Sequence, residues 1–90
     1  MSADTDNATF LAAALGPELA RQLTQPLHLA QARAAFTALT SGDSPGIARA
    51  WFHGMNPQLD DANPLQAINA GHGDAVIIAA RNHARGDNAN

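Results

Sequence analysis

The stretch that decides the fold is residues 48–65, which read ARAWFHGMNPQLDDANPL. It holds the single tryptophan of the chain, Trp51, and two of the five prolines. Pro57 and Pro64 restrict the backbone, and Asn63 before Pro64 is a typical N-cap followed by proline at the first helical position. We therefore expect a helix end, a compact loop and a helix start. Trp51 is expected to be the core hub of the C-terminal half, because an indole offers more burial than any other side chain here.

Glycine and proline divide the rest of the chain into further short helical segments. The longest runs from about Leu27 to Ser41, where apolar side chains recur at steps of three and four residues, and Gly42 follows as an expected left-handed C-cap. The run Val76-Ile77-Ile78 is expected in a helix, because a single isolated strand has no partner. The expected helices span 9–15, 17 to a break at Pro26, 27–41, 45–53, 64 to a break at 71–73, and 74–86 with Asp74 as N-cap and Gly86 as stop, while residues 1–7 are expected to fray.

Composition bounds the fold class and the location of the chain. Ninety residues make one domain, and 21 alanines against three Phe, one Trp and no Tyr favour helices that pack closely. We therefore expect an all-α fold, a compact bundle of five to six short helices. No apolar run approaches the roughly 20 residues that span a bilayer, and the N-terminus is acidic. These features predict a cytoplasmic protein with no membrane segment.

The residue types that usually carry chemistry form no catalytic or metal constellation in this sequence. The absence of Cys excludes disulfides and thiolate metal sites, and no two of the four histidines have the spacing of ligands on one helix face. Asp60-Asp61 has no nucleophile beside it and is interpreted as a solvated loop. The prediction is a binding protein and not an enzyme, without metal or cofactor. The net charge of −3 also argues against a free-standing nucleic-acid surface.

Two of the five arginines lie in the C-terminal sequence Arg81-Asn82-His83-Ala84-Arg85-Gly86. Cations near the C-terminal end of a helix are stabilised by the helix dipole by roughly 0.3–1 kcal/mol, which accounts for them without any partner. The alternative interpretation is a protruding polar tail whose arginines dock on a partner.

From about Leu29 to Gly86 the chain resembles the toxin-binding domain of the Xre/MbcA/ParS-like antitoxins. In that family an apolar helix leads to a short helix that ends in a tryptophan, and a compact loop with Asn-Pro and a leucine follows. A proline-led helix with a leucine, a turn containing glycine and a final aliphatic helix ending near Arg and Gly complete the pattern. The matching residues are Leu39, 48–52 with Trp51, Asn56, Pro57, Leu59, Pro64, Leu65, 71–73, 76–80, Arg81 and Gly86.

The resemblance implies a bacterial type II antitoxin that binds a RES-domain toxin, an enzyme that consumes NAD+, and occludes its active site. In this family the C-terminal segment lies at the entrance to the toxin's active site. The candidate toxin-binding residues are therefore Arg81, Asn82, His83, Arg85 and Gly86. The implied assembly is a homodimer or a hetero-oligomer with the toxin. The implied organisation is a short N-terminal helical segment (1–28), a toxin-binding domain (29–86) and a polar tail (87–90).

Two features depart from the family pattern. The glycine before the proline-led helix is replaced by Asp61-Ala62-Asn63, and only about 28 residues precede the toxin-binding part, where family members usually carry a full helix-turn-helix domain. Residues 10–26 loosely resemble the start of such a motif, but the expected second helix holds Arg21 as its single cation, with Glu18 nearby. A small transcriptional regulator that binds DNA, and an orphan interaction module with the same fold, remain the alternatives.

Overall fold

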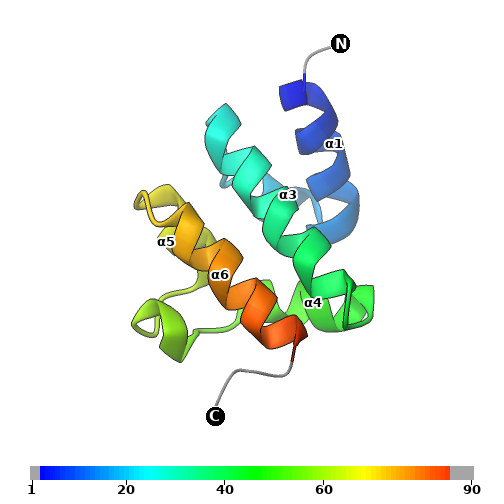
Figure 1. Ribbon diagram of the computed structural model, residues 1–90. Helices are drawn as coiled ribbons and strands as arrows, with labels where there is room; N and C mark the ends of the chain where they lie inside the picture. The colour runs from blue at the N-terminus through cyan, green and yellow to red at the C-terminus, as the bar shows by residue number, and fades with distance from the viewer. Residues whose placement is uncertain (1–2, 86–90) are drawn as a thin grey trace.

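The computed structural model describes residues 3–85, which form six α-helices, one short 3-10 helix and no strand (Figure 1). The all-α fold expected from the sequence is confirmed, and four of the helices have seven or more residues. None of the helices in this range combines the length and the hydropathy needed to cross a bilayer. The elements are α1 (Ala3–Leu15), α2 (Pro17–Ala20), α3 (Pro26–Thr40), α4 (Pro45–His53), the 3-10 helix η1 (Pro57–Leu59), α5 (Pro64–Asn69) and α6 (Gly73–Ala84).

Every proline of the chain begins a helix, where its missing N–H leaves no helical hydrogen bond unmade. Ser44 and Asn63 cap α4 and α5 as expected, each accepting a hydrogen bond from a backbone N–H of the first turn. One expectation about proline is wrong: Pro26 does not end the second helix but begins α3, and α2 has already ended at Ala20. The prolines at these first-turn positions are Pro17, Pro26, Pro45, Pro57 and Pro64.

Helix α1 begins at Ala3, so the expectation that residues 1–7 fray is wrong for the described part of that segment. Support from α3 explains the longer helix. The Nη1 atom of Arg33 donates to Oδ1 of Asn7 at 3.3 Å, and the Arg33 guanidinium lies 4.3 Å from the centre of the Phe10 ring. A cation over an aromatic face is attracted by the ring quadrupole, so α3 holds the middle of α1 in place.

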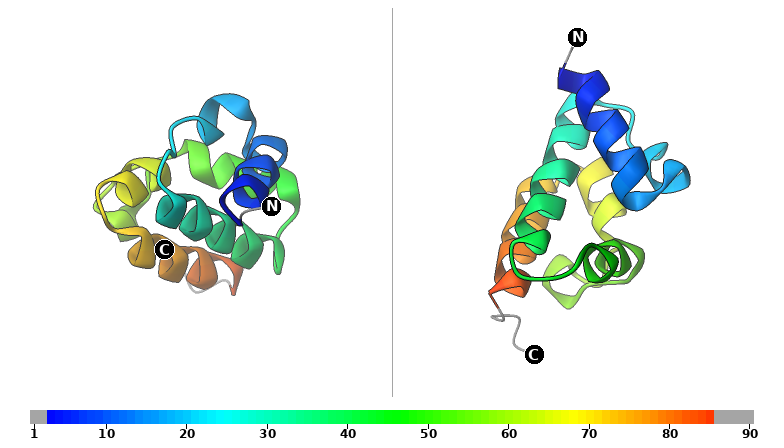
Figure 2. Two further views of the ribbon diagram at one scale, coloured as in Figure 1. Left: turned by 90° about the horizontal axis from the view of Figure 1, so that it is seen from above. Right: turned by 90° about the vertical axis from the view of Figure 1, so that its right-hand side faces the viewer.

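Helices α3 and α6 lie side by side and run in the same direction (Figures 1 and 2). Near their N-terminal ends a Cβ on Gly73 would meet the side chain of Gln31, and near their C-terminal ends a Cβ on Gly42 would meet the backbone of Ala84. Glycine therefore leaves the room that the close approach at each end of this pair requires. Helices α1 and α2 lie on the other side of α3, and the radius of gyration of the Cα atoms is 11.9 Å, close to the roughly 12 Å of a compact domain of this length.

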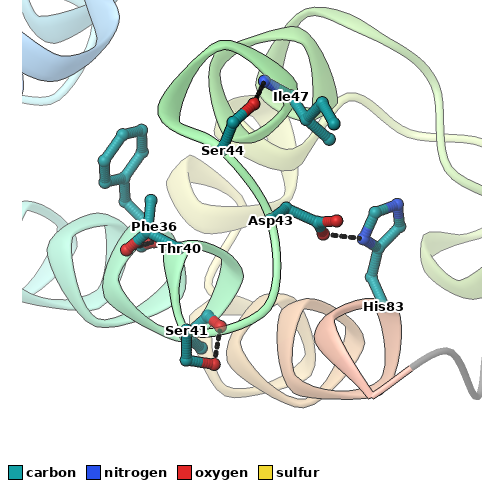
Figure 3. Close-up of polar contacts among 8 residues, drawn as sticks. Phe36, Thr40, Ser41, Asp43, Ser44, Ile47 and His83 are labelled. Atoms are coloured by element: carbon teal, nitrogen blue, oxygen red, sulfur yellow. Dashed lines mark hydrogen bonds and ion pairs between the residues drawn. The ribbon is translucent and has the colours of Figure 1, made fainter.

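Gly42 does not adopt the left-handed conformation expected of a C-cap. Ser41 caps α3 in a right-handed conformation, and the hydroxyls of Thr40 and Ser41 donate to earlier carbonyls of the same helix at distances between 2.6 and 3.2 Å (Figure 3). The carbonyl oxygen of Leu39 accepts from the backbone N–H groups of Gly42 and Asp43, so the end of the helix is satisfied without a left-handed residue. Gly42 is instead required for space, since a Cβ there would collide with the carbonyl oxygen of Ala84.

The start of α6 also differs from the expected one. Gly73 is its first residue and His72 its N-cap, without a capping bond from the side chain, so Asp74 lies inside the first turn and is not the cap. Gly71, with a φ of 95°, makes the left-handed turn before it. A carboxylate in the first turn still interacts favourably with the positive end of the helix dipole. The expected stop at Gly86 lies outside the described residues, as does the polar tail, 87–90.

Phe52, and not Trp51, occupies the centre of the core. Phe52 is fully buried (0 % exposed), and its ring centroid lies 6.4 Å from that of Phe36, which in turn meets the ring of Phe10 edge-on at 5.8 Å. Trp51 is only half-buried and packs edge-on against Phe52 at 5.3 Å. The expected hub role of Trp51 is therefore wrong. The face of α4 with Ala48 and Phe52 is fully buried, which leaves the tryptophan at the edge of the core.

Candidate functional site

The loop between α4 and α5 is closed by hydrogen bonds that start from Asn56. The side-chain oxygen of this nearly buried residue accepts from the backbone N–H of Gln58 at 2.9 Å, and its backbone pairs with Ala62 in an isolated bridge. Asp60 and Asp61 are exposed, and both take left-handed conformations with φ of 56° and 63°. Aspartate tolerates this region better than most residues. The two aspartates therefore make the turn without a glycine.

Asn63 joins this loop to the helices on either side. Its Nδ2 donates to the carbonyl oxygen of Phe52 at 2.8 Å, and its Oδ1 accepts from the N–H of Leu65 at 2.8 Å. The Oε1 of Gln66 accepts from the Asn63 N–H at 3.3 Å and completes a capping box. The loop therefore holds α4 and α5 at a defined angle. Of the residues that carry the family resemblance, Asn56, Leu59, Pro64 and Leu65 are buried, Trp51 is half-buried, and Pro57 is exposed at the start of η1.

Asn82 connects the same loop to the end of α6. Its Nδ2 donates to Oε1 of Gln58 at 3.3 Å, and its Oδ1 accepts from Nη2 of Arg85 at 2.8 Å. Asn82 is half-buried, whereas Arg85 is exposed. This candidate binding residue is thus engaged within the chain, where it orients the guanidinium of Arg85.

His83 is the second candidate that is engaged within the chain. Its Nδ1 donates to Oδ2 of Asp43 at 3.1 Å, which ties the end of α6 to the loop between α3 and α4 (Figure 3). The other contact of its ring is with Trp51, whose centroid lies 6.4 Å away in an edge-to-face arrangement. Because the bond to Asp43 occupies Nδ1, Nε2 is the ring nitrogen left for any further partner.

Arg81 differs from these two residues because its side chain is exposed and makes no hydrogen bond, ion pair or ring contact with any of residues 3–85. Arg85, the C-cap residue of α6, follows Arg81 by about one helical turn, so the two side chains lie on the same side of the helix. Together with Ala38, Ser41 and Ala84 they line an open pocket of about 270 Å³ between the C-terminal ends of α3 and α6. The remaining candidate, Gly86, lies outside the described residues.

The sequence did not single out Gln58 or Asp43 as part of this site. They lie 24 and 40 residues from the α6 side chains that they contact, Asn82 and His83. Neither position has a local signal, since a polar side chain in a loop is ordinarily solvated. Only the three-dimensional packing of α6 against η1 and beside α3 brings them into contact.

Metal binding and DNA recognition were the other two functions weighed for this chain, and the described residues bear on both. No group of three or more His, Asp or Glu side chains gathers there in a way that could hold a metal ion. Helix α2, the expected second helix of a DNA-binding motif, has four residues including Glu18. Its neighbour Arg21 is bonded through Nε to the carbonyl oxygen of Pro17 at 3.3 Å. A single turn is too short to place several side chains on base edges in the manner of a recognition helix.

The site that emerges is the C-terminal end of α6, held from two sides by hydrogen bonds of Asn82 and His83, with Arg81 exposed beside it. Comparisons of the chain with protein-family models, with curated proteins and with solved structures find no match.

Proposed function

We propose that this chain is the antitoxin of a bacterial type II toxin–antitoxin system, which binds a RES-domain toxin and covers the entrance to its NAD+-consuming active site. The proposal makes the chain a cytoplasmic binding protein and not an enzyme. Inhibition of this kind needs no metal or cofactor, because a bound protein that fills the entrance excludes the substrate by its volume alone.

The observation that carries the proposal is the way in which the residues of the family resemblance meet. Asn56 closes the loop, and Leu59 and Leu65 are buried beneath it. The end of α6 is attached to this loop through Asn82. The residues that carry the resemblance therefore belong to one connected structural unit, and this unit holds the C-terminal end of α6 in place.

The side chain offered to the toxin in this proposal is Arg81, with Arg85 one turn later. A guanidinium presents five donors in a planar fork, which suits the carboxylate groups of a protein partner. Arg81 has no partner among the described residues, so binding would break no side-chain interaction of Arg81 within residues 3–85. Asn82 and His83 act in this proposal as supports of the helix end.

The test is co-expression with a RES-domain toxin, the partner that the proposal requires, with growth as the readout. We expect the wild-type chain to relieve the growth arrest that the toxin causes. Arg81→Ala should weaken the relief, whereas Arg21→Ala, which removes the same charge from the exposed end of α2, should leave it intact. Deletion of the whole segment 81–90 is a poorer test, because it also removes the two bonds that hold α6 in place.

Growth arrest that persists with the wild-type chain present at comparable levels would refute the antitoxin proposal. A salt-dependent complex with its own promoter DNA would then favour the transcriptional regulator instead. Full relief by the Arg81→Ala variant would keep the antitoxin function and remove Arg81 from its mechanism.

A further inference from the structure

The outer side of α6 carries one stripe of exposed side chains. Steps of four, three and four residues place its members on the same side of the helix, opposite to the side that packs into the core. Figure 2 shows α6 at the edge of the molecule, and no other helix of the described range covers this side. We call this set the α6 outer stripe, and its residues are Asp74, Ile78, Arg81 and Arg85.

The charges of the α6 outer stripe are separated along the helix. Asp74 lies in the first turn, Arg81 and the C-cap residue Arg85 lie at the other end, and Ile78, which is 56 % exposed, lies between them. Asp74 and Arg81 are roughly 10.5 Å apart along the helix axis, so they do not pair with each other. Neither of these two side chains forms a hydrogen bond or an ion pair with any other of residues 3–85. Both charges are therefore available to a partner.

This order of charges makes the stripe complementary to a second copy of itself that runs in the opposite direction. Asp74 lies about 6 Å before Ile78 along the helix axis, and Arg81 lies about 4.5 Å after it. A two-fold axis beside Ile78 therefore brings Asp74 of each chain opposite Arg81 of the other, with an offset of only about 1.5 Å. The two Ile78 side chains meet at the axis, and every other contact is made twice.

The adjacent part of α3 leaves room for a second helix. Helices α3 and α6 run in the same direction and are in close contact at both ends, so Ile78 is level with the middle of α3. Ala34 is exposed there and Ala38 is half-buried, and the two share one face of α3. Ala38 also lines the open pocket beside Arg81. These small side chains do not obstruct a helix that lies against the α6 outer stripe.

We propose that the α6 outer stripe is the interface of a homodimer. The α6 helices of two chains pair antiparallel, with Ile78 at the axis and Asp74 paired with Arg81 of the second copy. This inference does not depend on the proposed function, but it adds a form of regulation to it. If a toxin also binds Arg81, the second copy and the toxin compete for the same face, and binding of the toxin dissociates the dimer.

The experiment measures the association of the full chain by sedimentation equilibrium at low ionic strength, at concentrations up to about 1 mM. Two single helix faces bury little area, so we expect a dissociation constant of about 10–100 µM. Ile78→Arg places like charges at the axis and should raise this constant at least about tenfold. Ile47→Arg on α4, at a site with a similar exposed fraction of 50 %, is the matched control and should change it less than about twofold. Circular dichroism checks that each variant is folded.

Exchange of the two charges tests the pairing itself. Asp74→Arg and Arg81→Asp each place like charges opposite one another twice, and each should raise the dissociation constant about tenfold. The double variant Asp74→Arg/Arg81→Asp restores opposite charges and should return to within about threefold of the wild type. Both substitutions oppose the helix dipole, so the double variant cannot regain association through a more stable helix. Restoration therefore identifies a contact between chains.

Three results would overturn the inference. A wild-type chain that stays monomeric at about 1 mM has no such interface. A dimer that Ile78→Arg leaves unchanged is formed through another face. If the two single charge variants dissociate the dimer and the double variant does not restore it, the antiparallel pairing is wrong. All of these measurements use the chain alone, so they leave the antitoxin proposal to its own test.

Discussion

Phe52 and Trp51 are neighbours in the sequence, yet they take different roles in the fold. Helical spacing places Ile47 with Trp51 on one stripe of α4, and Ala48 with Phe52 on the next. Both stripes are apolar, so the local pattern does not decide which of them faces inward. The decision comes from the packing of α4 against α1, α3 and α5, which is tertiary information. Because tryptophan is the largest side chain, the sequence favoured the stripe of Trp51 as the buried one, which is wrong.

The difference can be measured at the level of single residues. We expect Phe52→Ala to lower the free energy of unfolding by about 3–5 kcal/mol, since it leaves a cavity at the centre of the core. Trp51→Ala should cost about 1–2 kcal/mol, because the half-buried indole loses less contact. Urea denaturation followed by circular dichroism gives both values, and an equal or larger loss for Trp51→Ala would place the hub back at the tryptophan.

Helix starts were easier to predict than helix ends in this chain. Pro17, Pro45 and Pro64 set the starts of their helices through a local rule, and Ser44 and Asn63 supply the caps. Ends and extensions depend on contacts distant in sequence. The N-terminal half of α1 is supported by a side chain of α3, and the loop at the end of α3 must leave room for α6. The partners of the candidate binding residues could not be predicted either, because they too are distant in sequence.

Helix α5 has only six residues, so it should depend strongly on its cap. Asn63→Ala removes the acceptor for the Leu65 N–H and also the donor to the Phe52 carbonyl, and we expect a loss of about 2 kcal/mol in the free energy of unfolding. Ser44→Ala, which removes one exposed bond of 3.3 Å from α4, is the matched control with an expected loss of about 0.5–1 kcal/mol. Equal losses in urea denaturation would mean that the bond between Asn63 and Phe52 contributes nothing.

The pairing of α3 with α6 gives a second test at the scale of elements. A Cβ at position 42 would collide with the carbonyl oxygen of Ala84, which moves only if the end of α6 moves. Gly42→Ala should therefore cost about 1–3 kcal/mol. A Cβ at position 73 meets only the flexible side chain of Gln31, and alanine is the better helix former, so Gly73→Ala should change stability by less than about 0.5 kcal/mol. Thermal unfolding compares the two variants, and the reverse order would contradict this account of the packing.

At the scale of the whole molecule, the chain is a helical bundle that positions the end of α6. Composition, proline placement and glycine breaks were enough to predict the all-α class, because each follows from local propensity. The contacts of the candidate binding residues could be found only from the structure. The sequence predicted a single row of binding residues at 81–86, but Asn82 and His83 are engaged in bonds to Gln58 and Asp43. Arg81 remains exposed, and the Trp51 ring of α4 lies beside the same helix end, in contact with the His83 ring.

The measurement that tests the antitoxin proposal most directly is NAD+ consumption by a purified RES-domain toxin, the proposed partner, titrated with the full chain. Occlusion of the active site predicts that activity falls in proportion to added chain and disappears when the toxin is saturated. The Arg81→Ala variant should require more protein for the same inhibition. Undiminished NAD+ consumption in the presence of a large excess of the folded wild-type chain would contradict the account.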